Sequence, residues 1–158
     1  EQLGVTIALE NPADDVDAAL NDGADAAQIA AAVDHPLVRI NYDPGNFLTH
    51  RPGQAAHVDI EPALPYCIGL HLKDLRQEGE GWVHTALGDG SILWDEMFNR
   101  LALLAARPLL SIEIPTRMRR DSRGKIVLQS EPMPLAQIET LLMRSKALVD
   151  AQIARLNE

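Results

Sequence analysis

The stretch Val38-Arg39-Ile40-Asn41-Tyr42-Asp43-Pro44-Gly45-Asn46 has the pattern of a β-strand that ends abruptly. VRINYD is strand-like and ends in an acidic residue, and the Pro-Gly pair directly after it breaks the strand. Three other runs share this arrangement: VTIALE at 5–10, CIGLHL at 67–72 and PLLSIEI at 108–114. We therefore predict four strands, each with a polar group near its carboxyl end.

Helical segments separate and follow these strands. The Ala-rich run at 25–33 and the periodic apolar patterns at 92–106 and 135–156 predict helices, and 54–64 predicts a shorter one. Strands that alternate with helices indicate an α/β fold with a parallel sheet, here built from four consecutive βα units. Four units are too few for an eight-stranded barrel of about 250 residues. Residues 1–158 are thus expected to form one domain or part of a larger one.

Two segments stand outside this alternation. Residues 77–90 follow the third strand, and residues 116–134 follow the fourth and precede the closing helix. Asp121-Ser122-Arg123-Gly124 reads as a turn, so we expect 116–134 to contain an exposed hairpin or loop insertion.

Composition excludes several classes of protein. With 158 residues, 46% of them hydrophobic, the chain is globular rather than disordered. A net charge of −9 argues against nucleic acid as a partner, because phosphate binding needs clustered Lys and Arg. A single cysteine, Cys67, favours a reducing compartment, with the cytoplasm expected. We expect no membrane span and no signal peptide, and the missing initiator Met suggests a start inside a longer protein.

Four potential metal ligands occupy equivalent places, at or near the ends of the four strands: Glu10, Asp43, His71 and Glu113. In parallel α/β folds the carboxyl ends of the strands share one face, which holds the active site. Three carboxylates and one imidazole suit one divalent cation such as Mn²⁺, Mg²⁺, Co²⁺ or Zn²⁺. Alternatively, each is only a polar residue where a strand meets a loop.

The blocks around these positions resemble the xylose isomerase-like TIM barrels, which include sugar phosphate isomerases and epimerases, ketose 3-epimerases, inosose dehydratases and, more distantly, endonuclease IV. The resemblance rests on these stretches: Ala8-Leu9-Glu10-Asn11, Asn41 to Asn46, Gly69-Leu70-His71-Leu72-Lys73-Asp74, Gly81-Trp82-Val83-His84, Leu87-Gly88-Asp89-Gly90 and Ser111-Ile112-Glu113-Ile114. It implies that the four strands correspond to strands five to eight of a TIM (β/α)8 barrel.

The resemblance also implies roles for the strand-end groups. Glu10, Asp43, His71 and Glu113 would bind one divalent metal, and Glu10 and Glu113 would act as acid and base on a sugar or related polyol. Proton transfer next to a carbonyl, through an enediolate, would isomerise or epimerise the substrate. A lyase that dehydrates an inosose or a dehydroshikimate-like acid fits the same groups. A non-catalytic half-barrel is a third reading, and endonuclease activity is a weaker one.

Four further residues are candidates for contact with the substrate: Asn46, Lys73, His84 and Arg117. Asn46 stands where many relatives have the His of Asp-x-x-His, so it can bond a hydroxyl but cannot shuttle a proton. Lys73 leaves the same strand face as His71. A turn residue, a surface histidine and a solvated arginine remain the plainer readings of Asn46, His84 and Arg117.

An isolated set of four βα units has two open sheet edges. We therefore expect self-association with a second copy, or completion by a missing N-terminal half. We also expect part of an apolar set to point into the barrel and to require cover. That set is Val5, Ile7, Leu9, Val38, Ile40, Ile68, Leu70, Leu110 and Ile112.

Overall fold

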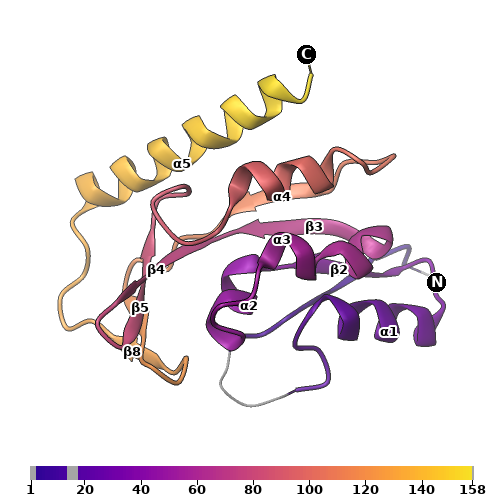
Figure 1. Ribbon diagram of the computed structural model, residues 1–158, viewed down its shortest axis with the longest axis horizontal. Coiled ribbons are helices and arrows are strands. Elements are labelled where there is room, and N and C mark those ends of the chain that lie inside the picture. Colours follow the sequence, from indigo (N-terminus) through magenta and orange to yellow (C-terminus); the bar gives the residue numbers. More distant parts are fainter. Residues whose placement is uncertain (1–2, 14–17, 158) are drawn as a thin grey trace.

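The computed structural model describes residues 3–13 and 18–157, which form two sheets flanked by helices (Figure 1). The first sheet has the order β1-β2-β3-β6 and is parallel throughout. Its strands are β1 (Ile7–Glu10), β2 (Val38–Tyr42), β3 (Cys67–Leu72) and β6 (Leu109–Ile112). The prediction of an α/β fold with a parallel sheet is confirmed.

The helices are α1 (Gly23–Val33), α2 (Pro44–His50), α3 (Ala56–Asp59), the 3₁₀ helix η1 (Glu61–Tyr66), α4 (Trp94–Leu101) and α5 (Leu135–Arg155). The single helix expected at 54–64 is divided between α3 and η1, and the helix expected at 92–106 is shorter. None of the helices in the described ranges combines the length and apolar character that crossing a membrane requires.

The sequence did not predict α2. Asp43 and Pro44 read as a break, but they begin a helix: the Asp43 carboxylate accepts a hydrogen bond from Asn46 N, and Pro44 occupies the first turn. Proline fits there because the backbone N–H groups of the first helical turn have no acceptor within the helix, so the N–H that proline lacks is not needed. A residue expected at a strand end therefore also caps the following helix.

The second sheet is antiparallel and has the order β4-β5-β7-β8. Strands β4 (Asp74–Glu78) and β5 (Gly81–Thr85) form one hairpin, and β7 (Met118–Arg120) and β8 (Ile126–Leu128) form another, within 116–134. β5 pairs with β7, so the two excursions from the parallel sheet meet at its carboxyl side (Figure 1).

The core lies between the parallel sheet and its helices. Ile40, Tyr42, Leu70 and Leu72 face the helices and are fully buried or nearly so. The strand register places a mostly polar or small set on the opposite face. That set is Ala8, Glu10, Arg39, Asn41, Gly69, His71, Leu109 and Ser111.

Only part of the predicted apolar set was expected to point into the barrel, and the alternation turns Leu9, Ile40, Leu70 and their equivalents towards the helices. Exposed apolar side chains of the parallel sheet include Ile68 on the inner strand β3 and one residue on each edge strand. Ile7 on β1 is 57% exposed and Leu109 on β6 is 77% exposed.

Candidate metal centre

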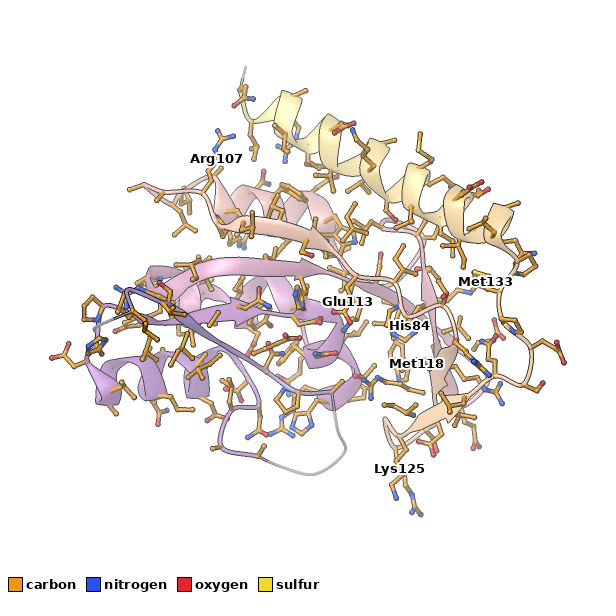
Figure 2. All side chains as sticks on the ribbon, turned by 180° about the vertical axis from the view of Figure 1, so that it is seen from behind. His84, Arg107, Glu113, Met118, Lys125 and Met133 are labelled. Atoms are coloured by element: carbon orange, nitrogen blue, oxygen red, sulfur yellow. The ribbon has the colours of Figure 1, made fainter. Side chains whose placement is uncertain are left out.

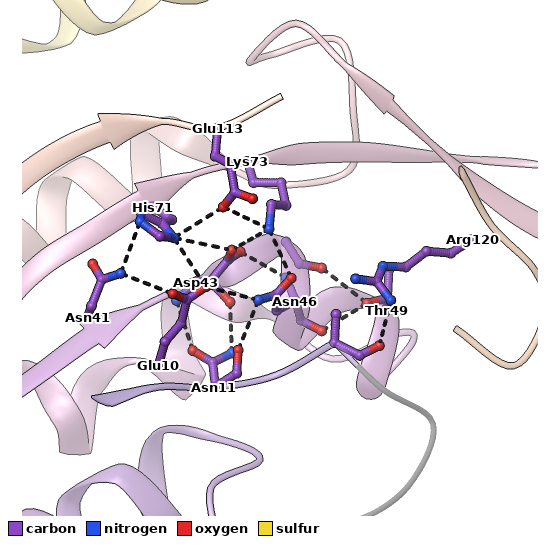
Figure 3. A network of polar contacts seen from close by, with 12 residues as sticks. Glu10, Asn11, Asn41, Asp43, Asn46, Thr49, His71, Lys73, Glu113 and Arg120 are labelled. Carbon is purple, nitrogen blue, oxygen red and sulfur yellow. Dashed lines mark hydrogen bonds and ion pairs between the residues drawn. The ribbon is translucent and has the colours of Figure 1, made fainter. Parts of the chain in front are cut away.

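The four strand-end groups converge. One ligand atom from each of Glu10, Asp43, His71 and Glu113 lies within 4.8 Å of the other three. The residues come from the carboxyl ends of all four parallel strands, and Figure 3 shows their side chains pointing towards one another. Glu113 lies one residue beyond β6, where its N–H still donates to Leu72 O. The parallel sheet thus brings together groups that are as far apart in the sequence as Glu10 and Glu113.

His71 is at the middle of the cluster. Its Nδ1 lies 3.1 Å from Glu10 Oε1 and 3.1 Å from Glu113 Oε2, and 3.9 Å from Asp43 Oδ2. The other ring nitrogen, Nε2, is 3.1 Å from the amide of Asn41, a residue that the sequence did not single out for this site. Since the Asn41 atom is Nδ2, which can only donate, Nε2 accepts here and Nδ1 carries the proton that faces Glu10 and Glu113. A metal at Nδ1 would move the ring proton to Nε2 and would require the Asn41 amide to turn its oxygen towards it.

Asp43 is fully buried, and both of its carboxylate oxygens have partners. Lys73 Nζ donates to Oδ2 at 2.7 Å, and Asn46 N donates to Oδ1 at 2.9 Å. Burial raises the pKa of Asp43 to about 6, although Lys73 and Asn46 oppose the shift. Asp43 is therefore mostly ionised at neutral pH and held in one orientation.

Lys73 links two of the four groups. Its Nζ lies 3.0 Å from Glu113 Oε2, in addition to its contact with Asp43, and 3.1 Å from Asn46 Oδ1. Burial opposes its charge, but Asp43 and Glu113 outweigh that effect and raise the pKa of Lys73. The side chain is only 6% exposed, so its contacts are with carboxylates beneath the open surface.

Asn46 also reaches Glu10. Its Nδ2 donates to Glu10 Oε1 at 3.2 Å and to Asn11 O at 2.9 Å. Because Lys73 occupies Oδ1, both ends of the Asn46 amide are engaged inside the site.

His84 and Arg117 lie apart from the four convergent groups. His84, on β5, lies between Glu113 and Met118 in Figure 2, and its ring Nδ1 is 3.1 Å from Met118 O. Since a carbonyl can only accept, Nδ1 carries the proton there. Burial lowers the pKa of His84 to about 4. Arg117 is exposed just before β7, outside the described contacts of the four groups.

The donor set fits a divalent cation. A metal-bound imidazole is neutral, so three carboxylates and the Lys73 ammonium leave two negative charges in the cluster. One divalent ion balances them. Three oxygen ligands and one nitrogen ligand are compatible with Mn²⁺, Mg²⁺, Co²⁺ or Zn²⁺.

Comparison with known proteins identifies the fold family. The sequence profile described as "Xylose isomerase-like TIM barrel" matches residues 1–138. The chain belongs to the xylose isomerase-like TIM barrel family. No curated protein was matched in a search by sequence.

Three solved structures share the fold of this xylose isomerase-like chain. A xylose isomerase domain protein from Planctomyces limnophilus gives a TM-score of 0.70 at 18% identity, over 99% of this chain and 49% of that one. An L-ribulose 3-epimerase gives 0.66 at 15% identity, over 99% and 50%. A xylose isomerase domain protein from Alicyclobacillus acidocaldarius subsp. acidocaldarius gives 0.62 at 17% identity, over 99% and 53%. The chain thus spans about half the length of these proteins, and its fold matches half of such a barrel.

Proposed function

We propose that this chain supplies the metal centre of a divalent-metal-dependent isomerase or epimerase that acts on a sugar or related polyol. The observation that carries the proposal is the convergence of Glu10, Asp43, His71 and Glu113 from four successive strands of the parallel sheet. The family, and the fold shared with an L-ribulose 3-epimerase, support a sugar as the substrate.

Glu10 and Glu113 differ from Asp43 in the part that they take in this proposal. A divalent ion held by Glu10, Asp43, His71 and Glu113 would polarise a ketose carbonyl and the neighbouring hydroxyl, which would make the adjacent C–H more acidic. Glu10 and Glu113 are 35% and 40% exposed at their side chains, so they can meet a substrate on the open face. One carboxylate removes the proton and the other returns it, a contribution of about 10²–10⁴-fold. Asp43 is buried and serves as a ligand only.

Lys73 and Asn46 are better suited to holding these carboxylates than to meeting a substrate. Lys73 is engaged by Asp43, Glu113 and Asn46, and the Asn46 amide is engaged at both ends. Their role as substrate ligands would require these bonds to break. His84, on β5, and the exposed Arg117 remain proposed contacts for the more distant part of the substrate.

We also propose that the four strands correspond to strands five to eight of the barrel, and that four further βα units complete it, from an N-terminal half or a second copy. The exposed Ile7 and Leu109 lie on β1 and β6, the two edge strands of the parallel sheet. Unpaired edges with apolar side chains favour pairing with another strand.

Product analysis tests the activity. The protein, loaded with Mn²⁺ and in its native assembly, would be incubated with ketoses, including L-ribulose and D-fructose, and with inososes. Exchange of solvent deuterium into the carbon beside the carbonyl, with an epimer or isomer as product, would support the proposal. Loss of water from the inosose would identify a lyase on the same centre. No exchange with any substrate from a metal-loaded protein would contradict the proposed catalysis and favour a non-catalytic half-barrel.

A further inference from the structure

Asn11 binds the backbone of a proposed metal ligand at two points. Its Nδ2 donates to Asp43 O at 2.9 Å, and its Oδ1 accepts from Asp43 N at 2.8 Å. The side chain is 1% exposed, so neither bond is shared with bulk water. Both polar ends of the Asn11 amide are therefore used on Asp43, a residue 32 positions away.

These bonds lie where the backbone pairing of two strands stops. The β1–β2 register ends at Glu10 and Asn41. Two residues later, Asp43 leaves the strand and begins α2, so its N–H and C=O have moved beyond the ladder. The Asn11 side chain supplies the acceptor for Asp43 N–H, and it gives Asp43 O a second donor beside Phe47 N, which lies 3.1 Å from that oxygen.

Asn11 is also connected to the Glu10 side chain, through Asn46. The backbone oxygen of Asn11 accepts from Asn46 Nδ2, which also donates to Glu10 Oε1. Asn46 N in turn donates to Asp43 Oδ1. A closed ring of hydrogen bonds therefore joins Asn11, Asp43 and Asn46 and extends to the Glu10 carboxylate (Figure 3).

From this geometry we infer that Asn11 is a positioning residue of the metal centre, which sets the separation of the Glu10 and Asp43 carboxylates without itself touching the ion. The inference rests on the proposed metal centre. Mutation of a residue that orients a metal ligand typically lowers metal affinity by about 10–100-fold. A residue with only a structural role would lower stability and leave the ligand geometry intact.

Three variants of the full chain separate these roles. Asn11→Leu removes both bonds to Asp43. Asn11→Asp keeps an acceptor for Asp43 N but places a carboxylate oxygen against Asp43 O. Asn21→Leu is the matched control, because Asn21 is also a buried asparagine, bonded to Ala18 and Asp25 away from the cluster.

Mn²⁺ affinity by titration calorimetry and the visible spectrum of the Co²⁺ form would be recorded at a temperature where each variant is folded. We expect Asn11→Leu to weaken Mn²⁺ binding at least tenfold and to alter the Co²⁺ bands, with Asn11→Asp intermediate. Asn21→Leu should melt earlier but keep wild-type affinity and bands. Wild-type affinity and an unchanged Co²⁺ spectrum in Asn11→Leu would overturn the inference. Absence of Mn²⁺ binding by the wild-type chain would instead refute the metal centre.

Discussion

Lys73 Nζ lies 2.7 Å from Asp43 Oδ2, and both side chains are shielded from solvent. The pair joins the end of β2 to the residue directly after β3, beneath the carboxylates that face the open side of the sheet. Such a pair holds a ligand in place in the absence of metal. It also leaves a buried carboxylate without a counter-charge if the lysine is lost.

We predict that Lys73→Met destabilises the metal-free protein. Removing one partner of a buried ion pair typically costs about 3–5 kcal/mol, because the remaining charge stays buried. Mn²⁺ should restore part of this loss, so it should raise the melting temperature more in the variant than in the wild type. Lys146→Met is the control: Lys146 pairs with Asp150 on the exposed side of α5, and such pairs contribute about 0.5 kcal/mol. Equal thermal stability of Lys73→Met and Lys146→Met, both without metal, would contradict the assignment.

We predict that the Asp74 carboxylate holds the loop after β5 in its conformation. Its carboxylate accepts from the backbone N–H of Gly88, Gly90 and Ile92 and from Trp94 Nε1, at 2.9–3.2 Å. Asp74→Asn keeps the shape but turns an NH₂ group towards these donors. An unsatisfied buried donor costs roughly 1–3 kcal/mol, so we expect a loss of roughly 3 kcal/mol or more.

Denaturant unfolding measures that loss, and hydrogen exchange should show faster exchange at Gly88 and Gly90. The matched change Asp89→Asn alters only an exposed ion pair with Arg144 and should cost less than about 1 kcal/mol. Wild-type exchange rates at Gly88 and Gly90 in Asp74→Asn would show that the carboxylate does not hold the loop.

His84 should make stability depend on pH. Its pKa is lowered by burial to about 4, below the unfolded value of about 6.5, so the unfolded state binds the proton more readily. Neutral His84 makes its full contribution to the free energy of unfolding above about pH 6.5, and this contribution is lost as the pH falls towards 4. The stability difference between the wild type and His84→Gln should therefore shrink over this window by about 3 kcal/mol. A difference that is constant from pH 7 to pH 4 would show that His84 titrates normally.

The sequence predicted the centre of this site and missed the residues around it. Glu10, His71 and Glu113 could be foreseen because each falls at the end of a β-branched or apolar run, and parallel strands bring such ends together. Asn11 and Asn41 could not, because their contacts depend on the register between neighbouring strands. The antiparallel sheet was missed for a similar reason, since the pairing of Trp82 with Arg120 joins two segments that give only local turn signals.

The isolated 158-residue chain should associate through its sheet edges. Light scattering with size exclusion should give a mass above the 17.3 kDa of one chain, increasing with concentration. Lysines at both edges, in the double variant Ile7→Lys and Leu109→Lys, should reduce association, because edge lysines oppose strand pairing. A wild-type monomer with one cooperative melt would refute this prediction and favour a self-sufficient open sheet.

The binding of Mn²⁺ to the wild-type chain tests the central claim most directly. Titration calorimetry should give one ion per chain, with His71→Ala removing the binding because the imidazole is the shared neighbour of Glu10 and Glu113. His57→Ala, a histidine of α3, should bind as the wild type does. Failure of the wild type to bind Mn²⁺, Mg²⁺, Co²⁺ or Zn²⁺, or unchanged affinity in His71→Ala, would contradict a metal centre at the ends of these four strands.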